Sequence, residues 1–299
     1  MSYDHDILAA TQVFSKNLHM LAQQKQSKLA DAVRMESMSS ASQFFDRVGT
    51  IEMIARTSRH QDTAFTPVPF SRRRVDISDF EVGDIIDKVE DAAKAMVDPQ
   101  SATTQAFLQA GNRNLDNIII NQGLLGNAVT TDAGFTVTTV AAPSGSATVA
   151  VGSTNLPTSK IKDAIEIAQN NDVDLSDDKP YLVITPSQYR SLLSENEFIN
   201  RDFKLTSGNQ HSVNALNEIL GVDIRIVSPS LLPKTSNTRT CILFTKGSVV
   251  VGVQNKFMIE AGKDYSKGGS IRIIGKQNIG AVRMEEARVV PIFCDESAT

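Results

Sequence analysis

The sequence lacks several features that would point to a membrane or to a secreted scaffold. It has no tryptophan and only two cysteines, Cys241 and Cys294, which exclude a disulfide framework and a four-cysteine zinc site. Both lie in strand-like runs and are predicted to be buried free thiols, made in a reducing, intracellular compartment. No apolar run approaches the roughly 18 residues that cross a bilayer. No secretory signal is expected, because no basic start precedes an apolar stretch at the N-terminus.

Recognisable catalytic motifs are missing as well. Four histidines are scattered over the chain: His5, His19, His60 and His211. None has a serine, cysteine or aspartate around it in a setting typical of nucleophilic catalysis. No stretch matches the glycine-rich frames that bind phosphates. Glu285 and Glu286 are adjacent, so on a strand their side chains point to opposite faces and cannot work as an acid/base pair. The sequence therefore predicts no enzyme, no metal site and no cofactor.

Composition is that of an ordinary globular protein. The chain has 299 residues, of which 41% are hydrophobic and 21% charged, and its net charge is -4. This length allows one large domain or two modest ones. The mild negative charge gives no support for strong DNA binding.

The first 79 residues are predicted to project from the body of the protein. Residues 1–45 read as a mostly helical, amphipathic arm that ends in a linker, "RMESMSSASQ". Nothing adjacent in sequence covers its apolar stripe, so we expect the arm to pack on another surface. Residues 46–79 read as a long extended hairpin, whose tip is stiffened by Pro67 and Pro69. A two-stranded hairpin is marginal in water, so it too needs a surface to lie on.

Two helices and a hairpin are predicted next. Residues 80–97 show helical spacing of apolar side chains with acids between them. Asp98 and Pro99 suit the start of a second helix, which runs to about Leu125 and would be about 40 Å long. Such a helix is a spine on which smaller elements pack. The alternating runs "FTVTTV" and "ATVAVG" predict a β-hairpin within 127–152, with "APSGS" as its turn.

The second half of the chain predicts a compact α/β part followed by strands. Helices are expected at 159–171, in "TPSQYRSLLS" and in "SVNALNEILG", and strands in "YLVIT" and "VDIRIV". After residue 238 the runs "RTCILF", "KFMIEA", "SIRIIG" and "ARVVPIF" predict strands. The piece "KGSVVVGVQ" fits either a short helix or a strand.

Charges of opposite sign are separated along the first hundred residues. The basic stretch holds five arginines and His60 against one acid, and the stretch after it holds seven acids against Lys88. If the basic hairpin extends away from its own body, a neighbouring copy offers the acids instead, in a head-to-tail contact. A solvated loop with intramolecular pairs is the alternative. The candidate intersubunit residues are Arg56, Arg59, His60, Asp62, Arg72, Arg73, Arg74, Asp79, Glu81, Asp84 and Asp87.

Several segments together resemble a known family. The run "FFDRVGTIEMIARTSRHQDTAFTPVPFSRRRVDISDFEVGDIID", the long helix, "KPYLVITPSQYRSLLS" and "GAVRMEEARVVPIFCDES" follow one another in the order found in major capsid proteins of tailed bacteriophages. The resemblance is strongest to the short-tailed-phage branch and covers about residues 40–297. Its motifs "DRVG", "RHQDT", "RRR" and "RMEE" are moderately specific together and weak singly.

The resemblance implies an α+β, HK97-like fold. Residues 1–45 would be the N-terminal arm and 46–79 the extended loop that reaches over a neighbouring subunit. Residues 80–156 would form the peripheral domain, with the spine helix at 98–125 and the hairpin at 127–152. The axial domain would span 157–265, and 266–299 would return as strands to the peripheral domain.

The same resemblance implies the function. The chain would self-assemble into pentamers and hexamers of an icosahedral shell around double-stranded DNA, without reading its sequence. It would be made in the bacterial cytoplasm and end in the virion, with portal, scaffolding and decoration proteins as candidate partners and no membrane. Some relatives cross-link neighbours through a loop lysine, but this chain has no lysine between Lys28 and Lys88, so a non-covalent shell is expected. The alternatives are an encapsulin-like compartment and, more remotely, a soluble hydrolase using Tyr189 and Asp223.

Overall fold

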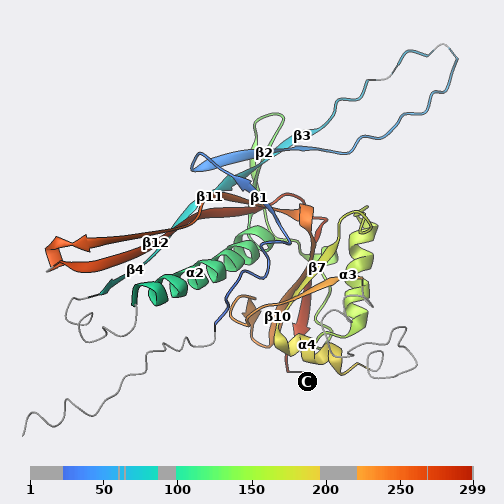
Figure 1. Cartoon of the computed structure of the whole chain (residues 1–299). Coiled ribbons are helices and arrows are strands. Elements are labelled where there is room, and N and C mark those ends of the chain that lie inside the picture. Colours follow the sequence, from blue (N-terminus) through green and yellow to red (C-terminus); the bar gives the residue numbers. More distant parts are fainter. Residues whose placement is uncertain are drawn as a thin grey trace, which may run out of the picture. The chain divides into compact units, whose positions relative to one another are not determined.

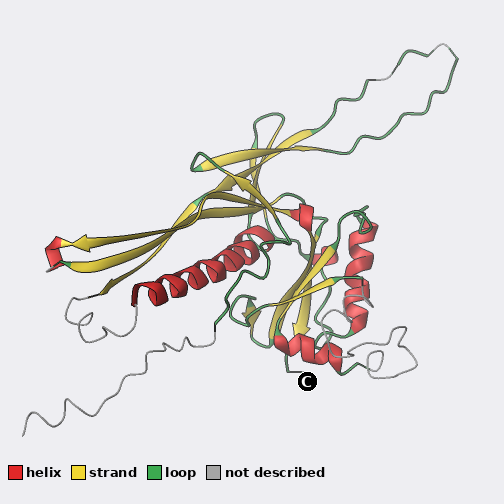
Figure 2. Cartoon of the chain, viewed as in Figure 1, coloured by secondary structure: helices red, strands yellow, loops and turns green. Residues whose placement is uncertain are grey.

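The structure is a computed structural model that describes residues 23–59, 61–63, 65–86, 99–195, 221–267 and 269–297 (Figure 1). These residues divide into two compact units, each with an apolar cluster of its own. The smaller unit takes its residues from 23–26, 79–86, 99–113, 255–267 and 269–277, and the larger unit takes the rest. Long strands and few helices give the predicted α+β class (Figure 2).

The helices and strands follow one another along the chain as β1 (Arg34–Ser37), β2 (Ser42–Val48), β3 (Phe70–Asp76), β4 (Ser78–Ile86), α2 (Pro99–Ile118), β5 (Ala128–Asp132), β6 (Val137–Val140), α3 (Thr158–Asn170), β7 (Pro180–Ile184), α4 (Pro186–Leu193), β8 (Asp223–Ile226), β9 (Lys234–Thr235), β10 (Thr238–Thr245), β11 (Val249–Asp264), β12 (Ser270–Arg283) and β13 (Val289–Asp295). A π-helical turn, Ile119–Leu124, continues α2, so the predicted spine helix is confirmed almost to its predicted end.

The predicted α/β part lies in the larger unit. Its sheet has the order β13-β10-β7-β8, with β9 beside β10. Every residue of β7 is buried, and β7 pairs parallel with β8 and antiparallel with β10. Apolar side chains of α3 pack on this sheet in one core with both cysteines, which are free and buried as predicted. The predicted helix "SVNALNEILG" lies outside the described residues, apart from Gly221.

A second sheet of the larger unit has the order β2-β3-β5-β6. β2 and β3 are the antiparallel strands of the predicted extended hairpin, and the segment between Val48 and Phe70 joins them as a long loop. The predicted pairing of "FTVTTV" with "ATVAVG" is wrong: β6, within the first run, pairs with β5, the turn is at 133–136, and the second run forms no strand but a single bridge from Val149 to Ile292. Asp132 explains the position of the turn, because its Oδ1 accepts hydrogen bonds from the backbone N–H groups of Gly134 and Thr136, at 2.9 and 2.8 Å.

The third sheet has the order β1-β11-β12-β4. β11 and β12 are 16 and 14 residues long and include the predicted strands "KFMIEA" and "SIRIIG". The piece "KGSVVVGVQ" forms a short 3-10 turn at Lys246–Ser248 and then enters β11. Phe107 of α2 and Ile273 of β12 form the centre of the smaller unit's apolar cluster.

Two predictions about the first hundred residues were wrong. Residues 80–86 belong to strand β4 rather than to a helix, because Val82 packs with Ile271 and Ile273 of β12; the rest of the predicted helix, 87–97, is outside the described residues. Residues 23–45 contain no helix, and the proposed linker holds β1 and the start of β2. Residues 1–22 are also outside the described part.

The segment that follows residue 26 is covered by its own chain rather than by another surface. Leu29 and Val33 are buried, and β1 pairs parallel with β11, from Arg34 opposite Val250 to Ser37 opposite Val253. The buried carboxylate of Asp116 anchors the turn before β1, since it accepts hydrogen bonds from the backbone of Lys28 and Leu29, at 2.9 and 3.2 Å. Residues 27–37 therefore belong to the body of the larger unit.

Candidate assembly interface

The loop between β2 and β3 exposes apolar side chains that nothing in the described part of the larger unit covers. Met53 is fully exposed and Phe65 is 92% exposed. The loop leads away from its sheet in Figure 1. Burying a large apolar side chain stabilises a protein by about 1.5–3 kcal/mol, so this much exposed apolar surface is typical of an interaction surface. The exposed apolar residues of the loop and its two ends are Val48, Ile51, Met53, Ile54, Phe65, Val68 and Phe70.

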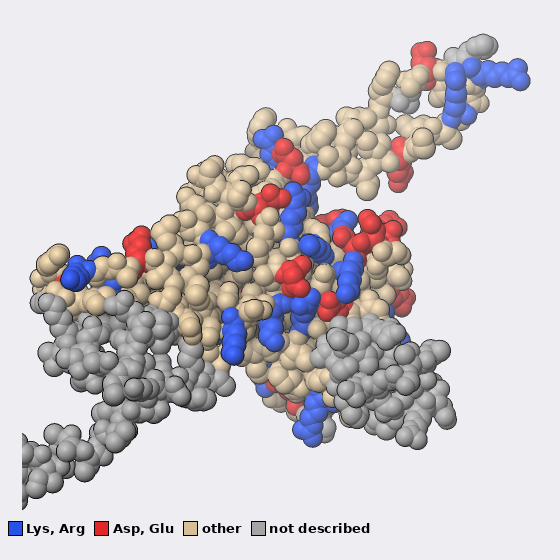
Figure 3. All heavy atoms as spheres, viewed as in Figure 1, with Lys and Arg blue, Asp and Glu red and all other residues tan. Residues whose placement is uncertain are grey.

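The far end of the loop is turned by hydrogen bonds within the loop. The Arg56 guanidinium donates to the carbonyls of Arg59 and Gln61, at 2.9 and 3.1 Å, and the Gln61 side chain accepts from Thr57. Arg56, Arg59 and Asp62 are exposed, and His60 lies outside the described residues. Basic and acidic atoms accordingly gather at the end of the loop in Figure 3, while the stretch nearer the sheet is almost uncharged.

Two of the three consecutive arginines on β3 lie on the exposed face of the β2-β3-β5-β6 sheet. Arg72 Nε is 2.7 Å from the Asp46 carboxylate, and Arg74 Nε is 3.0 Å from Asp76. These are the intramolecular pairs of the alternative interpretation. Exposed pairs contribute only about 0–1 kcal/mol, so both arginines can still contact another chain at little cost.

Arg73 does not belong to the predicted interface. Its side chain is 1% exposed, because β3 turns it toward the interior, where it donates to both oxygens of Glu286, at 2.6 and 2.8 Å. Burial lowers the pKa of the Arg73 guanidinium, and the Glu286 carboxylate opposes that shift. Alternation along a strand places every second side chain on the other face, which explains why Arg73 differs from its neighbours.

Glu286 also forms ion pairs with two other arginines. It lies 3.4 Å from Arg283 Nε and 3.8 Å from Arg47 Nη1. Arg283 is fully buried and donates to four backbone carbonyls, at 2.6–3.3 Å, which belong to Leu124, Gly126, Val140 and Ala141. One guanidinium thus satisfies carbonyls at the end of the spine helix and at the end of β6. The sequence motif "RMEE" carries this cluster.

The predicted acidic partners lie on β4 of the smaller unit. Asp79, Glu81 and Asp84 are exposed, and Asp87 lies outside the described residues. Asp84 Oδ1 accepts a hydrogen bond from the backbone N–H of Ile85, at 2.9 Å. A pairing of these acids with the loop arginines of another copy stays a prediction.

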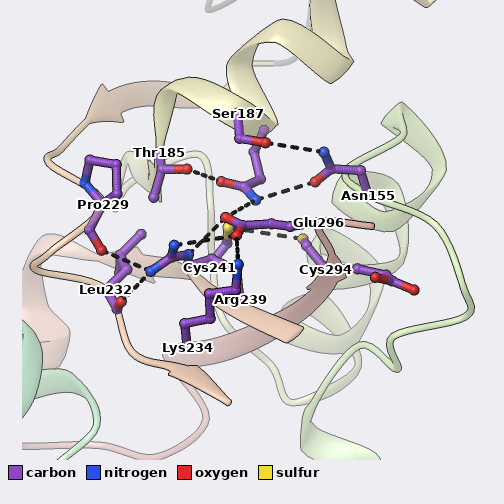
Figure 4. A network of polar contacts seen from close by, with 12 residues as sticks. Asn155, Thr185, Ser187, Pro229, Leu232, Lys234, Arg239, Cys241, Cys294 and Glu296 are labelled. Atoms are coloured by element: carbon purple, nitrogen blue, oxygen red, sulfur yellow. Dashed lines mark hydrogen bonds and ion pairs between the residues drawn. The ribbon is translucent and has the colours of Figure 1, made fainter. Parts of the chain in front are cut away.

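A second polar network, which sequence reasoning missed, closes the C-terminal end of β13 (Figure 4). Glu296 accepts hydrogen bonds from Arg239 Nε at 2.8 Å and from Gln188 Nε2 at 3.2 Å, and Lys234 Nζ is 2.6 Å away. The hydrogen bond from Arg239 lowers the pKa of Glu296 from 4.5 to about 2. The only sequence signal is that Arg239 and Glu296 flank apolar runs.

Lys160 on α3 is a buried lysine whose ammonium group binds backbone carbonyls. Its Nζ lies 2.6–3.0 Å from four of them, those of Val151, Thr154, Asn155 and Phe293. Burial lowers the pKa of the Lys160 ammonium. The side chain ties the irregular segment 151–155 to β13, which is a structural role.

The described residues show no metal site. They contain no group of three or more histidine, cysteine, aspartate or glutamate side chains that could hold a metal ion. Within the same ranges, no helix has the length and apolar character needed to span a membrane. The Asp223 carboxylate of the remote hydrolase alternative is 3.1 Å from Lys179 and 3.3 Å from Arg225, in ion pairs.

Comparison with known proteins assigns a family. The phage capsid protein family model matches residues 7–296. No curated protein sequence matches at a significant level. Solved structures with a similar fold include the capsid of cyanophage Pam1, with TM-score 0.67, 15% identity and full coverage of both chains. The capsid of Ralstonia phage GP4 has TM-score 0.67, 12% identity and coverage of 99% and 98%. The capsid of cyanophage P-SCSP1u has TM-score 0.64, 16% identity and coverage of 96% and 93%.

Proposed function

The chain belongs to the phage capsid protein family, and from this premise we propose that its copies form the pentamers and hexamers of an icosahedral shell around double-stranded DNA. As a member of the family it is a structural capsid protein and not an enzyme, and it self-assembles into the shell of a virion. The HK97-like fold expected from the resemblance is confirmed. Portal, scaffolding and decoration proteins are proposed partners, and the host cytoplasm is the proposed site of synthesis.

The observation that carries the proposal is the uncovered loop at 49–69. It exposes large apolar side chains along its length, yet it belongs to a chain whose other strands are well paired. An exposed apolar surface of this kind marks a place where another molecule binds. In a shell, that molecule is a neighbouring copy, so we assign residues 46–79 to the extended intersubunit loop.

Charge complementarity supports the proposed contact at the far end of the loop. Arg56 and Arg59 are exposed there, and the acids Asp79, Glu81 and Asp84 are exposed on β4. Arg72 and Arg74 are additional candidates on the sheet, whereas Arg73 is excluded by its burial. Guanidinium groups bind carboxylates in a fixed geometry, so such pairs set the position of one subunit against the next.

The test is the double charge reversal Arg56→Glu/Arg59→Glu. We expect the subunit to fold, since both side chains are exposed, and the yield of closed particles in sedimentation and electron microscopy to fall at least about tenfold, because every subunit repeats the loss. The comparison variant, Arg56→Lys/Arg59→Lys, keeps the charge but loses the fork geometry, so its particle yield should fall between those of the wild type and the charge reversal. Normal particles from the charge reversal would overturn the assigned contact.

The alternative functions, a protein compartment and a hydrolase, are not favoured by the family assignment. An encapsulin-like compartment differs in what it encloses. Particles purified from infected cells should therefore contain double-stranded DNA, detected by nuclease-resistant absorbance and by gel. A protein cargo in place of nucleic acid would contradict the proposed function.

A further inference from the structure

The strand β6 is an unprotected edge of the β2-β3-β5-β6 sheet. Within the described part of the chain β6 pairs with β5 alone, and Val137, Thr138 and Thr139 are exposed. Edge strands of soluble proteins are usually protected by lysine, proline or other interruptions, because their free backbone groups invite another strand. Here the chain has no charged residue between Asp132 and Lys160, and β6 contains only valine and threonine.

The free hydrogen-bonding groups of this edge can be assigned. The backbone N–H of Asp132 donates to the carbonyl of Thr136, at 3.2 Å, so these two residues form a hydrogen-bonded pair. Along an antiparallel ladder, hydrogen-bonded pairs alternate with pairs that are not hydrogen-bonded. Thr130–Thr138 and Ala128–Val140 are therefore hydrogen-bonded pairs, whose backbone N–H and C=O groups point at each other. The N–H and C=O groups of Val137 and Thr139 then point outward, to the open edge.

Next to β6 the exposed face carries apolar side chains, and its charged residues Arg72, Arg74 and Asp46 lie farther in, on β3 and β2. Val137 is paired with Thr131 on β5, Thr131 with Arg72 on β3, and Arg72 with Asp46 on β2. Residues paired directly across a sheet point to the same side, so these four side chains share one face. Phe135, at the turn before β6, is 81% exposed, and Val137 is 62% exposed. On the same face the other large exposed apolar side chains are Phe44, Val48 and Phe70. A strand added to β6 would extend this apolar face.

We propose that residues 50–55 of a second copy of this chain add to β6 as a fifth, antiparallel strand. The segment "TIEMIA" belongs to no strand in the described part of the chain, all its residues are exposed, and it has no proline. Ile51 and Met53 are two residues apart, so they lie on one face of a strand, where Met53 meets Val137, with Phe135 diagonal to it, and Ile51 lies opposite Thr139. This deepens the proposed function, on which it rests, by naming the strand that receives the loop.

The antiparallel direction follows from charge. Between Asp132 and Lys160 the receiving strand is neutral, so Asp132, beside the β5–β6 turn, is the acid that this end of the edge offers, and Arg72 of β3 lies close by. With Glu52 opposite Thr138, an antiparallel segment places Arg56 opposite Gly134, within reach of the Asp132 carboxylate, and leaves Arg59 as the loop arginine proposed to meet the acids on β4. A parallel segment would place Arg56 near Ala141, whose carbonyl already binds the guanidinium of Arg283, a group of the same charge.

Disulfide formation between copies tests this register. In it Glu52 and Thr138 form a non-hydrogen-bonded pair, whose Cα atoms lie about 4.5 Å apart, within the range that a disulfide spans. Oxidised particles of Glu52→Cys/Thr138→Cys should give a ladder of covalent oligomers on a non-reducing denaturing gel. Each single variant should stop at dimers. The control pair Glu52→Cys/Ser42→Cys, on the opposite edge of the sheet, should give no ladder, and the native cysteines are buried.

A proline substitution gives an independent readout. Thr139→Pro removes an N–H that points to the open edge and leaves the ladder with β5 intact, so the subunit should fold while particle yield falls about tenfold or more. Thr139→Ala keeps the N–H and should assemble normally. Particles of the double-cysteine variant that run as monomers, or normal assembly of Thr139→Pro, would overturn the strand addition while leaving capsid function intact. Failure of the wild-type chain to form particles would instead overturn the proposed function as well.

Discussion

At the scale of single residues, the charges that hold the larger unit together are the buried ones. Arg283 and Arg73 converge on one carboxylate, Glu286, and Arg283 alone satisfies four backbone carbonyls. Breaking a buried ion pair leaves its partner unpaired in a poorly solvated place, which costs far more than an exposed pair is worth. The arginines that matter for stability and those proposed for assembly are therefore different residues.

Replacement of Arg283 should destabilise the subunit strongly. For Arg283→Ala we expect the free energy of unfolding to fall by about 3–5 kcal/mol, because buried carbonyls and Glu286 lose their donor. The measurement is chemical denaturation of dissociated subunits. Arg288→Ala, at a side chain that is 32% exposed, is the control and should cost about 1 kcal/mol or less. Equal losses for the two variants would contradict the assignment.

Acid should weaken the network around Glu296. The folded-state pKa of Glu296, about 2, lies below the ordinary 4.5, so its contribution is complete above pH 4.5 and is lost as the pH falls toward 2. The difference corresponds to roughly 3 kcal/mol. Denaturation midpoints measured between pH 6 and pH 2.5 should fall less steeply in Glu296→Gln, which starts from a lower stability. Parallel pH profiles for the two proteins would count against the assigned pKa.

At the scale of elements, close approach between backbones shapes the smaller unit. A Cβ on Gly111 of α2 would lie 2.6 Å from the ring of Phe257, and a Cβ on Gly275 of β12 would lie 2.7 Å from the same ring. The Phe257 ring of β11 is thus held between two glycines. A side chain at either glycine would push the Phe257 ring against the backbone of the other glycine. These two glycines therefore determine how closely α2 packs on β11 and β12.

Gly275→Ala should therefore destabilise the subunit by about 1–3 kcal/mol through overpacking. Gly262→Ala on β11 is the matched control, because nothing lies within 4 Å of the added Cβ there. Thermal unfolding of dissociated subunits would show a lowered midpoint for the first variant only. An unchanged midpoint for Gly275→Ala would show that the ring moves freely.

Elements with local signals could be predicted, and those that depend on distant partners could not. The spine helix, α3, β7 and α4 have their periodicity and end signals within a few residues. By contrast, β1 is defined by pairing with β11, more than 200 residues away, and its sequence "RMES" has no strand pattern. The apolar side chains of residues 80–86 are spaced in a way that fits both a helix, which repeats about every 3.6 residues, and a strand, which repeats every two. These residues form a strand because Val82 packs against β12.

The candidate site was predictable to a similar degree. The basic, proline-containing composition of 59–74 located the loop, because such a segment cannot form a core. Which of the three arginines faces inward depends on the phase of β3, which the run "RRR" does not reveal. Glu286 was noted only as one of two adjacent acids, since its partners lie on strands far away in sequence.

At the scale of the whole molecule, the proposed shell is held by many weak contacts between subunits and not by one strong bond. Exposed ion pairs contribute about 0–1 kcal/mol each, but a closed shell makes them simultaneously at every subunit. The loop then needs no covalent bond to stay in place. The absence of lysine between Lys28 and Lys88 agrees with a shell held without cross-links through this loop.

Boiled wild-type particles should consequently run as a single, monomeric band of this chain on a reducing denaturing gel. The native cysteines are buried and are not expected to link copies. A ladder of oligomers that survives reductant and boiling would refute the non-covalent shell. A particle that carries the Glu52→Cys/Thr138→Cys disulfide, run without reductant, provides the positive control for such a ladder.

The central claim is that a second copy of the chain covers the loop at 49–69. Electron microscopy of purified particles, at a resolution that traces the backbone, tests it most directly. We predict closed shells in which the loop of each subunit lies on its neighbour, with residues 50–55 beside that neighbour's β6. Single compact subunits that form no shell, or a loop folded back onto its own chain, would contradict the account.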